Sequence, residues 1–143
     1  MKLHMLRFAG FLVAATLAVS DASAADTMIA VGEVSMPPAS TANDVAALRD
    51  AAEGEIRPLD ASRLPRRQRF VVSLALTRAM AIDGPVACTV NAMLRDARTG
   101  VMIAIIEAGA RAEGPVSPEL KKQVAHAAVR SAMRRIPGAL GAK

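Results

Sequence analysis

The fold is decided by residues 68–112, which read QRFVVSLALTRAMAIDGPVACTVNAMLRDARTGVMIAIIEAGARA. Turn-forming sequences at 83–85 and 96–100 divide this stretch, because Gly and Pro interrupt regular secondary structure. The turns leave three β-prone runs, at 69–82, 86–94 and 101–112. Short runs joined by tight turns predict an antiparallel meander of three strands.

The first two runs alternate bulky apolar residues with small ones. The bulky residues of the first run are Phe70, Val72, Leu74, Leu76, Met80 and Ile82. The alternate positions of both runs are small or weakly polar and include Ser73, Ala75, Thr77, Ala87, Thr89 and Asn91. Such alternation is typical of strands with one buried face. We therefore expect helices on the bulky face and no cover on the small face, where a partner could bind.

Two features depart from this alternation. Arg78 falls on the bulky side of the first run, which indicates either a β-bulge or an arginine whose charged head reaches past the edge of the sheet. The third run is apolar on both faces from Val101 to Ile106. We therefore expect this strand to lie inside the sheet or beneath a helix.

The segments around the meander complete the predicted fold. A short β-prone run lies at 28–34, and apolar residues at helical spacing follow at 43–56, after a capping residue at Asn43. A second helix is predicted to begin with Ser117 as its cap and Pro118 in its first turn. The predicted fold class is α+β: a mainly antiparallel sheet of about four strands, in the order β-α-β-β-β-α, with two helices packed on one face.

The length of the chain fits a single domain. We interpret residues 25–143 as one α+β domain, because a chain of that size buries roughly two thirds of its unfolded surface in one core. Two prolines and several small polar residues predict a flexible loop at 35–42. The last residues, 138–143, are predicted to be a frayed tail.

Residues 1–24 have the three parts of a cleaved secretory signal peptide. Lys2 and Arg7 make the start basic, residues 8–19 are apolar, and 22–24 (Ala-Ser-Ala) are the small residues that precede a cleavage site. The apolar part is shorter than the roughly 20 residues that a membrane-spanning helix needs. We therefore predict an exported protein, periplasmic or secreted, with no transmembrane segment in the mature chain.

The connector between the first helix and the meander is rich in arginine. We identify a candidate patch for an anionic partner, such as lipid phosphates, lipopolysaccharide or an acidic protein face. Its residues are Arg63, Arg66, Arg67 and Arg69. The alternative is a solvated loop whose charges protect the following strand from aggregation. Nucleic acid is not an expected partner, because export separates the protein from it and Phe70 is the one aromatic residue after position 24.

Residues that carry most enzyme chemistry are scarce in this sequence. Cys88 is the single cysteine, and its position in the second run indicates a buried residue rather than a reactive thiol. His126 is predicted to face solvent on a basic stripe of the last helix, with no carboxylate placed to orient it. The usual nucleotide-binding, hydrolase and zinc motifs do not occur. We therefore expect no catalytic residues, no metal site and no cofactor.

The order of elements and the segment AAVRSA, residues 127–132, resemble small exported bacterial proteins of the cell envelope. In element order the chain is also similar to the amino-terminal domain of the Tol-system propeller protein and to the lipoprotein activators of penicillin-binding proteins, although it has no lipid-attachment cysteine near residue 24. The resemblance implies a non-catalytic interaction or scaffolding domain whose partner is an unknown envelope protein or anionic envelope component. The alternative is a small-ligand-binding protein or hydrolase, which would need a deep pocket lined by convergent polar groups.

Overall fold

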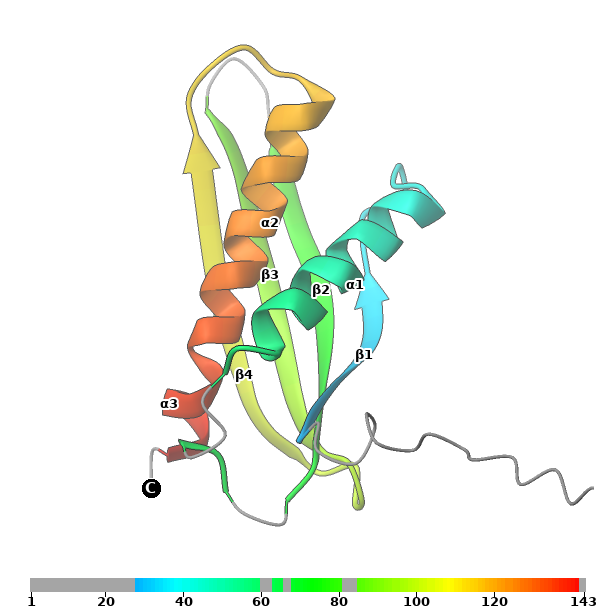
Figure 1. Ribbon diagram of the computed structural model, residues 1–143. Helices are drawn as coiled ribbons and strands as arrows, with labels where there is room; N and C mark the ends of the chain where they lie inside the picture. Colours follow the sequence, from blue (N-terminus) through cyan, green and yellow to red (C-terminus); the bar gives the residue numbers. More distant parts are fainter. Residues whose placement is uncertain (1–27, 60–62, 66–67, 81–84, 142–143) are drawn as a thin grey trace, which may run out of the picture.

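The structure is a computed structural model that describes residues 28–59, 63–65, 68–80 and 85–141, apart from the side chains of 78–80. Its elements are β1 (Ile29–Ser35), α1 (Ala42–Ile56), β2 (Phe70–Met80), β3 (Val86–Asp96), β4 (Met102–Ala112), α2 (Pro118–Arg134) and α3 (Ile136–Gly141). This order confirms the predicted β-α-β-β-β-α arrangement and adds a short third helix at its end (Figure 1). The predicted signal peptide at 1–24 lies outside the described residues.

The four strands form one mixed sheet in the order β1-β2-β3-β4. β1 runs parallel to β2, whereas β2, β3 and β4 are antiparallel neighbours. The parallel pair arises because α1 carries the chain back to the end of the sheet where β1 begins. Figure 1 shows α1 and α2 on the same face, and none of the described helices lies over the opposite face. The predicted α+β fold with two helices on one face is confirmed.

β4 lies at an edge of the sheet rather than inside it, but α2 and α3 contact it, so of the two expectations for this strand the position beneath a helix is the correct one. Within the described sheet it pairs with β3 alone. Its helix-side residues Ile106 and Ala108 are buried, whereas Met102, Ile103 and Ile105 are exposed. Apolar residues on both faces of a strand usually indicate burial on both sides. In β4 they instead mark a surface that the rest of the described chain leaves uncovered.

A β-bulge explains why Arg78 breaks the alternation of β2. The register between β2 and β3 pairs Leu76 with Val90 but Arg78 with Thr89. Thr77 is therefore an extra residue in the strand, which is the definition of a bulge. Of the two interpretations of Arg78, the bulge is correct.

A second irregularity lies in β1, where the register against β2 shifts between Val31 and Val34. The guanidinium of Arg49, from the middle of α1, donates hydrogen bonds to the carbonyl oxygens of Val31 (3.1 Å) and Gly32 (2.7 Å). Buried or partly buried carbonyl groups need such partners where the ladder is interrupted. Arg49 therefore ties α1 to the irregular part of β1.

The core lies between the helices and the bulky face of the sheet. Phe70, Leu74 and Leu94 are almost completely buried, as the alternation in the sequence predicts. On α2, Ala128 and Ala132 are fully buried. Their small side chains let the helix backbone approach the sheet closely, and the burial of apolar area on both sides provides most of the stabilisation.

Local capping residues set the helix starts. The hydroxyl of Thr41 accepts a hydrogen bond from the backbone N–H of Asp44 (3.2 Å), and the carboxylate of Asp44 accepts one from the N–H of Thr41 (2.8 Å). This reciprocal pair satisfies two free donors, so α1 begins at Ala42 rather than after the expected cap at Asn43. α2 begins as predicted, with Ser117 as its cap.

α3 occupies most of the stretch that was predicted to be a frayed tail, 138–143. Ile136 at its start is fully buried, and the N–H of Ala139 donates to the carbonyl oxygen of Arg135 (3.0 Å). The buried isoleucine holds this helix beside β4. The loop that separates β1 from α1 spans residues 36–41.

Candidate interaction surface

The face of the sheet opposite the helices, which we call the open face, has no described element packed on it. Its residues are Val71, Ser73 and Ala75 of β2, Ala87, Thr89, Asn91 and Met93 of β3, and Ile105, Glu107, Gly109 and Arg111 of β4. Those of β2 and β3 are partly exposed, and those of β4 are exposed. The small, weakly polar face predicted from the sequence lies on this side of the sheet.

Small residues make the middle of the open face flat. At Gly32 of β1, an added Cβ would lie 2.6 Å from Cγ1 of Val71 and 3.0 Å from Oγ of Ser73, so β1 and β2 pack closely on this side. Gly109 of β4 likewise presents backbone rather than a side chain. A flat surface with backbone close to it suits a partner with an extended or flat surface more than a small molecule, which needs a concave site.

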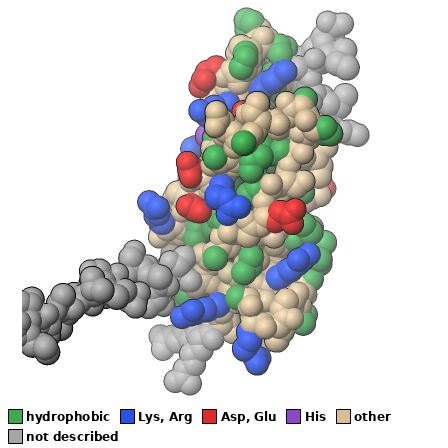
Figure 2. Space-filling view, turned by 90° about the vertical axis from the view of Figure 1, so that its right-hand side faces the viewer, with side chains coloured by type: hydrophobic (Ala, Val, Ile, Leu, Met, Phe, Trp, Pro, Cys, Tyr) green, Lys and Arg blue, Asp and Glu red, His purple; other side chains and the backbone are tan. Residues whose placement is uncertain are grey.

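Hydrophobic side chains are exposed at the β4 edge of the open face. Ile105 is 60% exposed and lies opposite Met93 across the β3–β4 pair. Further along β4 the face carries the charged residues Glu107 and Arg111. Figure 2, which views the molecule from the side of β1, shows hydrophobic side chains along its right-hand margin, on the side of the sheet away from the helices. Large exposed apolar residues beside polar ones are typical of surfaces that bind a partner.

Asn91 lies in the middle of this face with an unsatisfied polar atom. Its register partners are Ala75 on β2 and Glu107 on β4. The side-chain oxygen Oδ1 is buried and has no hydrogen-bond partner. Leaving a buried acceptor without a donor costs free energy. The centre of the open face therefore contains a buried polar atom without a hydrogen bond, whereas the core on the other side consists of apolar side chains.

The predicted arginine patch is only partly described by the structure. Arg63 and Arg69 are exposed, whereas Arg66 and Arg67 lie outside the described residues. Arg69 lies near Arg57: both line a hollow of about 580 Å³ at the end of the sheet where β1 and β2 begin. The binding of an anionic partner to this patch stays a prediction.

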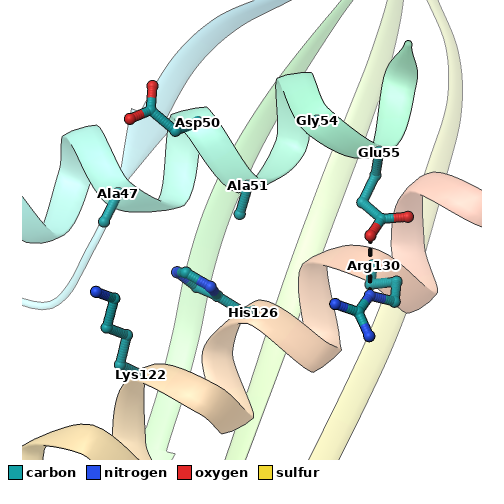
Figure 3. Close-up of a pocket in the computed structure, with 8 residues that line it drawn as sticks. All are labelled: Ala47, Asp50, Ala51, Gly54, Glu55, Lys122, His126 and Arg130. Atoms are coloured by element: carbon teal, nitrogen blue, oxygen red, sulfur yellow. Dashed lines mark hydrogen bonds and ion pairs between the residues drawn. The ribbon is translucent and has the colours of Figure 1, made fainter. Parts of the chain in front are cut away.

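A second hollow, of about 510 Å³, lies between α1 and α2 (Figure 3). Ala47, Ala51 and Gly54 of α1 leave room opposite α2. Figure 3 shows Lys122 and His126 of α2 reaching towards α1 across this space. The hollow is a shallow groove that is open to solvent rather than a deep pocket with convergent polar groups.

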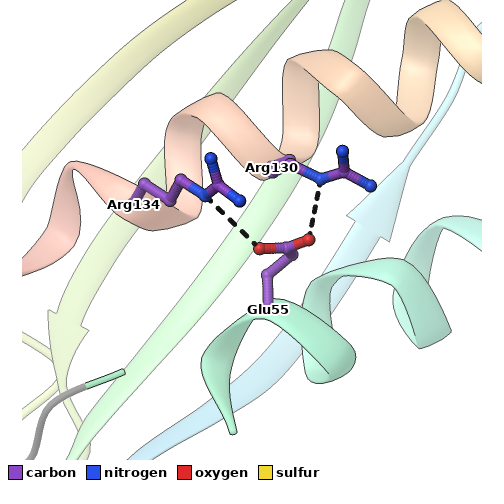
Figure 4. A network of polar contacts seen from close by, with 3 residues as sticks. All are labelled: Glu55, Arg130 and Arg134. Carbon is purple, nitrogen blue, oxygen red and sulfur yellow. Dashed lines mark hydrogen bonds and ion pairs between the residues drawn. The ribbon is translucent and has the colours of Figure 1, made fainter. Parts of the chain in front are cut away.

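Glu55 connects the two helices at one end of this groove (Figure 4). Its Oε1 accepts a hydrogen bond from Nε of Arg130 (2.8 Å), and its Oε2 lies 3.7 Å from Nε of Arg134. Both arginine side chains are exposed, and ion pairs of this kind contribute about 0.2–1 kcal/mol. The sequence analysis missed this contact, because Glu55 and Arg130 are distant in the chain.

His126 is partly buried in the groove, so the prediction that it faces solvent is wrong. Its Nε2 is buried and has no hydrogen-bond partner. Burial lowers the pKa of the imidazole, and the nearby charges of Lys122 and Arg130 lower it further, whereas Glu119 raises it. A general base needs a partner that orients the ring. Nε2 is buried, so a molecule in the groove could not reach that atom to exchange a proton with it.

Cys88 points into the core, as predicted, and is 3% exposed. Burial raises the pKa of its thiol to about 11, which disfavours the reactive thiolate. No three His, Cys, Asp or Glu side chains within the described ranges are grouped so that they could hold a metal ion. Neither Cys88 nor His126 therefore belongs to a recognisable catalytic arrangement.

Comparison with known proteins supports the fold and goes no further. No protein-family model and no curated protein matches the chain. Among solved structures, a hypothetical protein from Chlamydia trachomatis has a TM-score of 0.58 at 14% identity, over 80% of this chain and 98% of that one. PelC from Paraburkholderia phytofirmans, described as a dodecamer, has a TM-score of 0.53 at 15% identity, over 80% and 88%. A Xanthomonas campestris protein of the DUF330 family has a TM-score of 0.51 at 11% identity, over 77% and 81%.

At these identities the likeness establishes a shared fold alone. The neighbours are bacterial proteins of similar size, in agreement with the predicted resemblance to small bacterial α+β proteins. The resemblance to the Tol-system domain and to activators of penicillin-binding proteins stays a prediction. In the part of the chain that the structure describes, no helix is both long enough and apolar enough to cross a bilayer.

Proposed function

We propose that this protein is an exported, non-catalytic module of the bacterial cell envelope that binds a protein partner through its open face. The observation that carries the proposal is the one-sided cover of the sheet: α1 and α2 pack on one face, and the edge strand β4 displays Ile105 at 60% exposure on the other. Covering such an edge and face with a partner would remove apolar area from water, which is the main driving force of association.

The chemistry of the described side chains supports a non-catalytic role. Cys88 is buried with a raised pKa, and Nε2 of His126 is buried as well. Glu55, the carboxylate nearest to a cation in the groove, is engaged by Arg130. An active site usually brings a nucleophile, a base and an orienting group together. These residues are instead dispersed over the core and the helix surface.

The partner is expected to be a protein because the surface is flat and ends at an edge strand. One backbone group of that strand is already engaged, since Nη1 of Arg135 donates to the carbonyl oxygen of Glu107 (2.9 Å). A partner strand could pair with β4, or a partner surface could pack on Ile105 and Met93. One structural neighbour, PelC, is described as a dodecamer. A second copy of this chain is therefore one of the partners that an experiment has to detect.

Site-specific photocrosslinking in living cells tests the proposal. A photoreactive amino acid at Ile105 is expected to yield a discrete adduct in the envelope fraction. The same amino acid at Ala127, an exposed residue of α2 on the helix side, is the matched control and should yield none. The mass of the adduct distinguishes a second copy from another protein. Equal adducts from the two positions, or none from Ile105 and from Met93, would contradict the proposed role of the open face.

The alternative of a small-ligand protein would place its ligand in the groove between α1 and α2. The groove is open to solvent, and its cation Arg130 is already paired with Glu55. Ligand pockets are usually concave and bury most of the ligand. The geometry of the groove therefore supports this alternative less well than the open face supports a protein partner.

A further inference from the structure

One end of the domain combines exposed arginines with exposed apolar residues. Its arginines are Arg57, Arg69, Arg95 and Arg98, and its apolar residues are Val101, Met102 and Ile103. We call this set the basic end. It lies where β1 and β2 begin and where the β3–β4 turn projects, at the lower end of the molecule in Figure 1. We propose that the basic end docks on the surface of a membrane that contains anionic phospholipids.

The fold brings these arginines together from three separate parts of the chain. Arg57 follows α1, and the antiparallel course of that helix relative to β1 returns it to the end where the strands begin. Arg69 directly precedes β2 and lines the same hollow as Arg57. The β3–β4 turn joins them, since the N–H of Ala97 donates to the carbonyl oxygen of Arg69 (2.8 Å). The arginine-rich connector thus has both of its ends at the basic end.

The charge of this end is positive after its acidic groups are included. Glu53 also lines the hollow, and Asp96 begins the turn. The Asp96 carboxylate is occupied locally, because its Oδ1 accepts the backbone N–H groups of Arg98 and Thr99 at 2.8 Å each. In the view of Figure 2, Lys and Arg side chains lie around hydrophobic ones at the lower end, and acidic side chains lie higher. Among the described residues of this end, four arginines therefore lie near two carboxylates, and one carboxylate, that of Asp96, accepts hydrogen bonds within its own turn.

The apolar part of the basic end is a run of three consecutive residues. Val101 is 61% exposed, Met102 47% and Ile103 43%. The register between β3 and β4 pairs Leu94 with Ala104 but Arg95 with Met102, so Ile103 is an extra residue in β4. This irregularity interrupts the alternation that would otherwise turn every second side chain towards the core. Consecutive apolar side chains are therefore exposed directly beside Arg95 and Arg98.

A lipid surface could bind both the arginines and the apolar residues of the basic end at the same time. Phosphate groups of anionic lipids attract arginine within about a Debye length of the surface, and apolar side chains insert at the boundary between headgroups and acyl chains. A soluble anion would engage the arginines and leave Val101 and Ile103 in water. The adjacency of the two kinds of side chain is the reason for choosing a bilayer over a free phosphate. Arg95 and Met102 adjoin the open face, because Arg95 follows Asn91 and Met93 on the same side of β3 and pairs with Met102. Arg57, Arg69 and Arg98 lie outside the open face, so substitutions at Arg69 and Arg98 test this site separately from the protein partner proposed above.

Co-sedimentation with vesicles tests the inference. The purified protein without residues 1–24 is mixed with vesicles of phosphatidylglycerol and phosphatidylcholine in equal parts, or of phosphatidylcholine alone. Binding is expected to the first and not to the second, and it should weaken as the ionic strength rises. Equal binding to both compositions, or binding to neither, would overturn the proposal.

Two matched pairs of variants separate the basic end from the overall positive charge. Arg69→Ala combined with Arg98→Ala should lower the partition coefficient about 25-fold. Each arginine near an anionic surface contributes about 5-fold, and the two contributions multiply. The control, Arg130→Ala combined with Arg134→Ala, removes the same charge from α2 and should change binding little. Thermal melting verifies that each variant is folded. Equal losses from the two pairs would show that net charge, and not this end of the molecule, binds the vesicles.

The apolar pair distinguishes a membrane from a soluble anion. Val101→Ser combined with Ile103→Ser should weaken binding to the phosphatidylglycerol vesicles, whereas Ile105→Ser on the open face should leave it unchanged. Unchanged binding after the first pair would overturn docking on a bilayer, because the arginines alone would then account for the interaction. The Ile105 position also separates the two proposals: its crosslinks report the protein partner, and its substitution does not affect vesicle binding.

Discussion

The two faces of this sheet are formed by the same strands, and they differ because successive side chains point to opposite sides. On the covered face Phe70, Leu74 and Leu94 are buried under the helices. On the open face the intervening residues, such as Ser73 and Ala75, are small and partly exposed. The large side chains select the side on which helices pack, because covering them removes the most apolar area from water. The small side chains leave a flat, partly exposed surface that the described helices do not cover.

The largest expected difference between the faces is in stability. Leu74→Ala on the covered face should lower the free energy of unfolding by about 2–5 kcal/mol, because the lost contacts leave a cavity that the core fills only partly. Ile105→Ala, the matched change on the open face, should stay within about 0.5 kcal/mol, since Ile105 is already 60% exposed. Chemical denaturation measures both values. Comparable losses would mean that the open face is part of a core.

Thiol reactivity provides a second comparison within one molecule. In a Ser73→Cys variant, an introduced thiol on the open face competes for an alkylating reagent with Cys88 on the covered face. Burial raises the pKa of Cys88 to about 11, and the ordinary value is about 8.5, so the introduced thiol should react about 100-fold faster or more at neutral pH. Peptide mass spectrometry measures both rates in one sample. Similar rates in the folded protein would contradict the burial of Cys88.

Two glycines on the open side of the sheet test how closely its strands pack. Gly32→Ala should lower the free energy of unfolding by about 1–3 kcal/mol, because the new Cβ would lie 2.6 Å from the stiff, β-branched side chain of Val71. Gly109→Ala is the control, since its Cβ would find an ordinary contact of 3.5 Å with the carbonyl oxygen of Cys88. Thermal or chemical unfolding compares the two. An unaltered stability in Gly32→Ala would show that β1 can move away from β2 at little cost.

The smallest effect is expected from the helix layer in acid. The pKa of His126 is lowered in the folded protein by burial and by Lys122 and Arg130. The unfolded chain therefore binds the proton more readily, and stability should decline as the pH falls below about 6.5. The decline should be small because the ring is only partly buried and solvent screens its charge. Glu119 of α2 opposes this shift of the pKa, and Asp50 and Glu55 of α1 line the same groove.

A His126→Asn variant is the control for this pH dependence. Its stability should change less between neutral and mildly acidic pH than that of the original chain, as measured by denaturation at a series of pH values. A steeper decline in the variant would show that other groups dominate and that His126 stabilises the folded state in acid. In that case the two helices would be held together by a protonated, not a neutral, imidazole.

Much of the fold could be predicted from residues that are close together in the sequence. The turn around Gly100, the alternation in β2 and β3, and the cap at Ser117 are local features with local physical causes. The burial of Cys88 followed from strand parity in the same way. The turn predicted at 83–85 falls largely on residues 81–84, which lie outside the described residues. Sequence periodicity was a less reliable guide where a buried strand and an exposed strand would show the same run of apolar residues. The apolar run of β4 is an example, because exposure and burial leave the same sequence signature.

The candidate sites depended on contacts between distant segments. The arginine connector was recognised from its composition, but the meeting of Arg57 with Arg69 and of both with the β3–β4 turn required the parallel crossover through α1. The contacts of Glu55 with Arg130 and of Arg49 with β1 had no signal in the sequence. The solvent-facing position predicted for His126 was wrong because a helical wheel does not include the neighbouring helix.

The sequence by itself determined the α+β class, the strand meander, the start of α2 and the face of the sheet that the helices cover. These follow from side-chain size, periodicity and capping, which act over a few residues. The tertiary structure alone decided that β1 is parallel to β2, that β4 is an edge strand, and that one end of the domain is basic and apolar. Those properties depend on which distant segments become neighbours, and that choice is made by the packing of the whole chain.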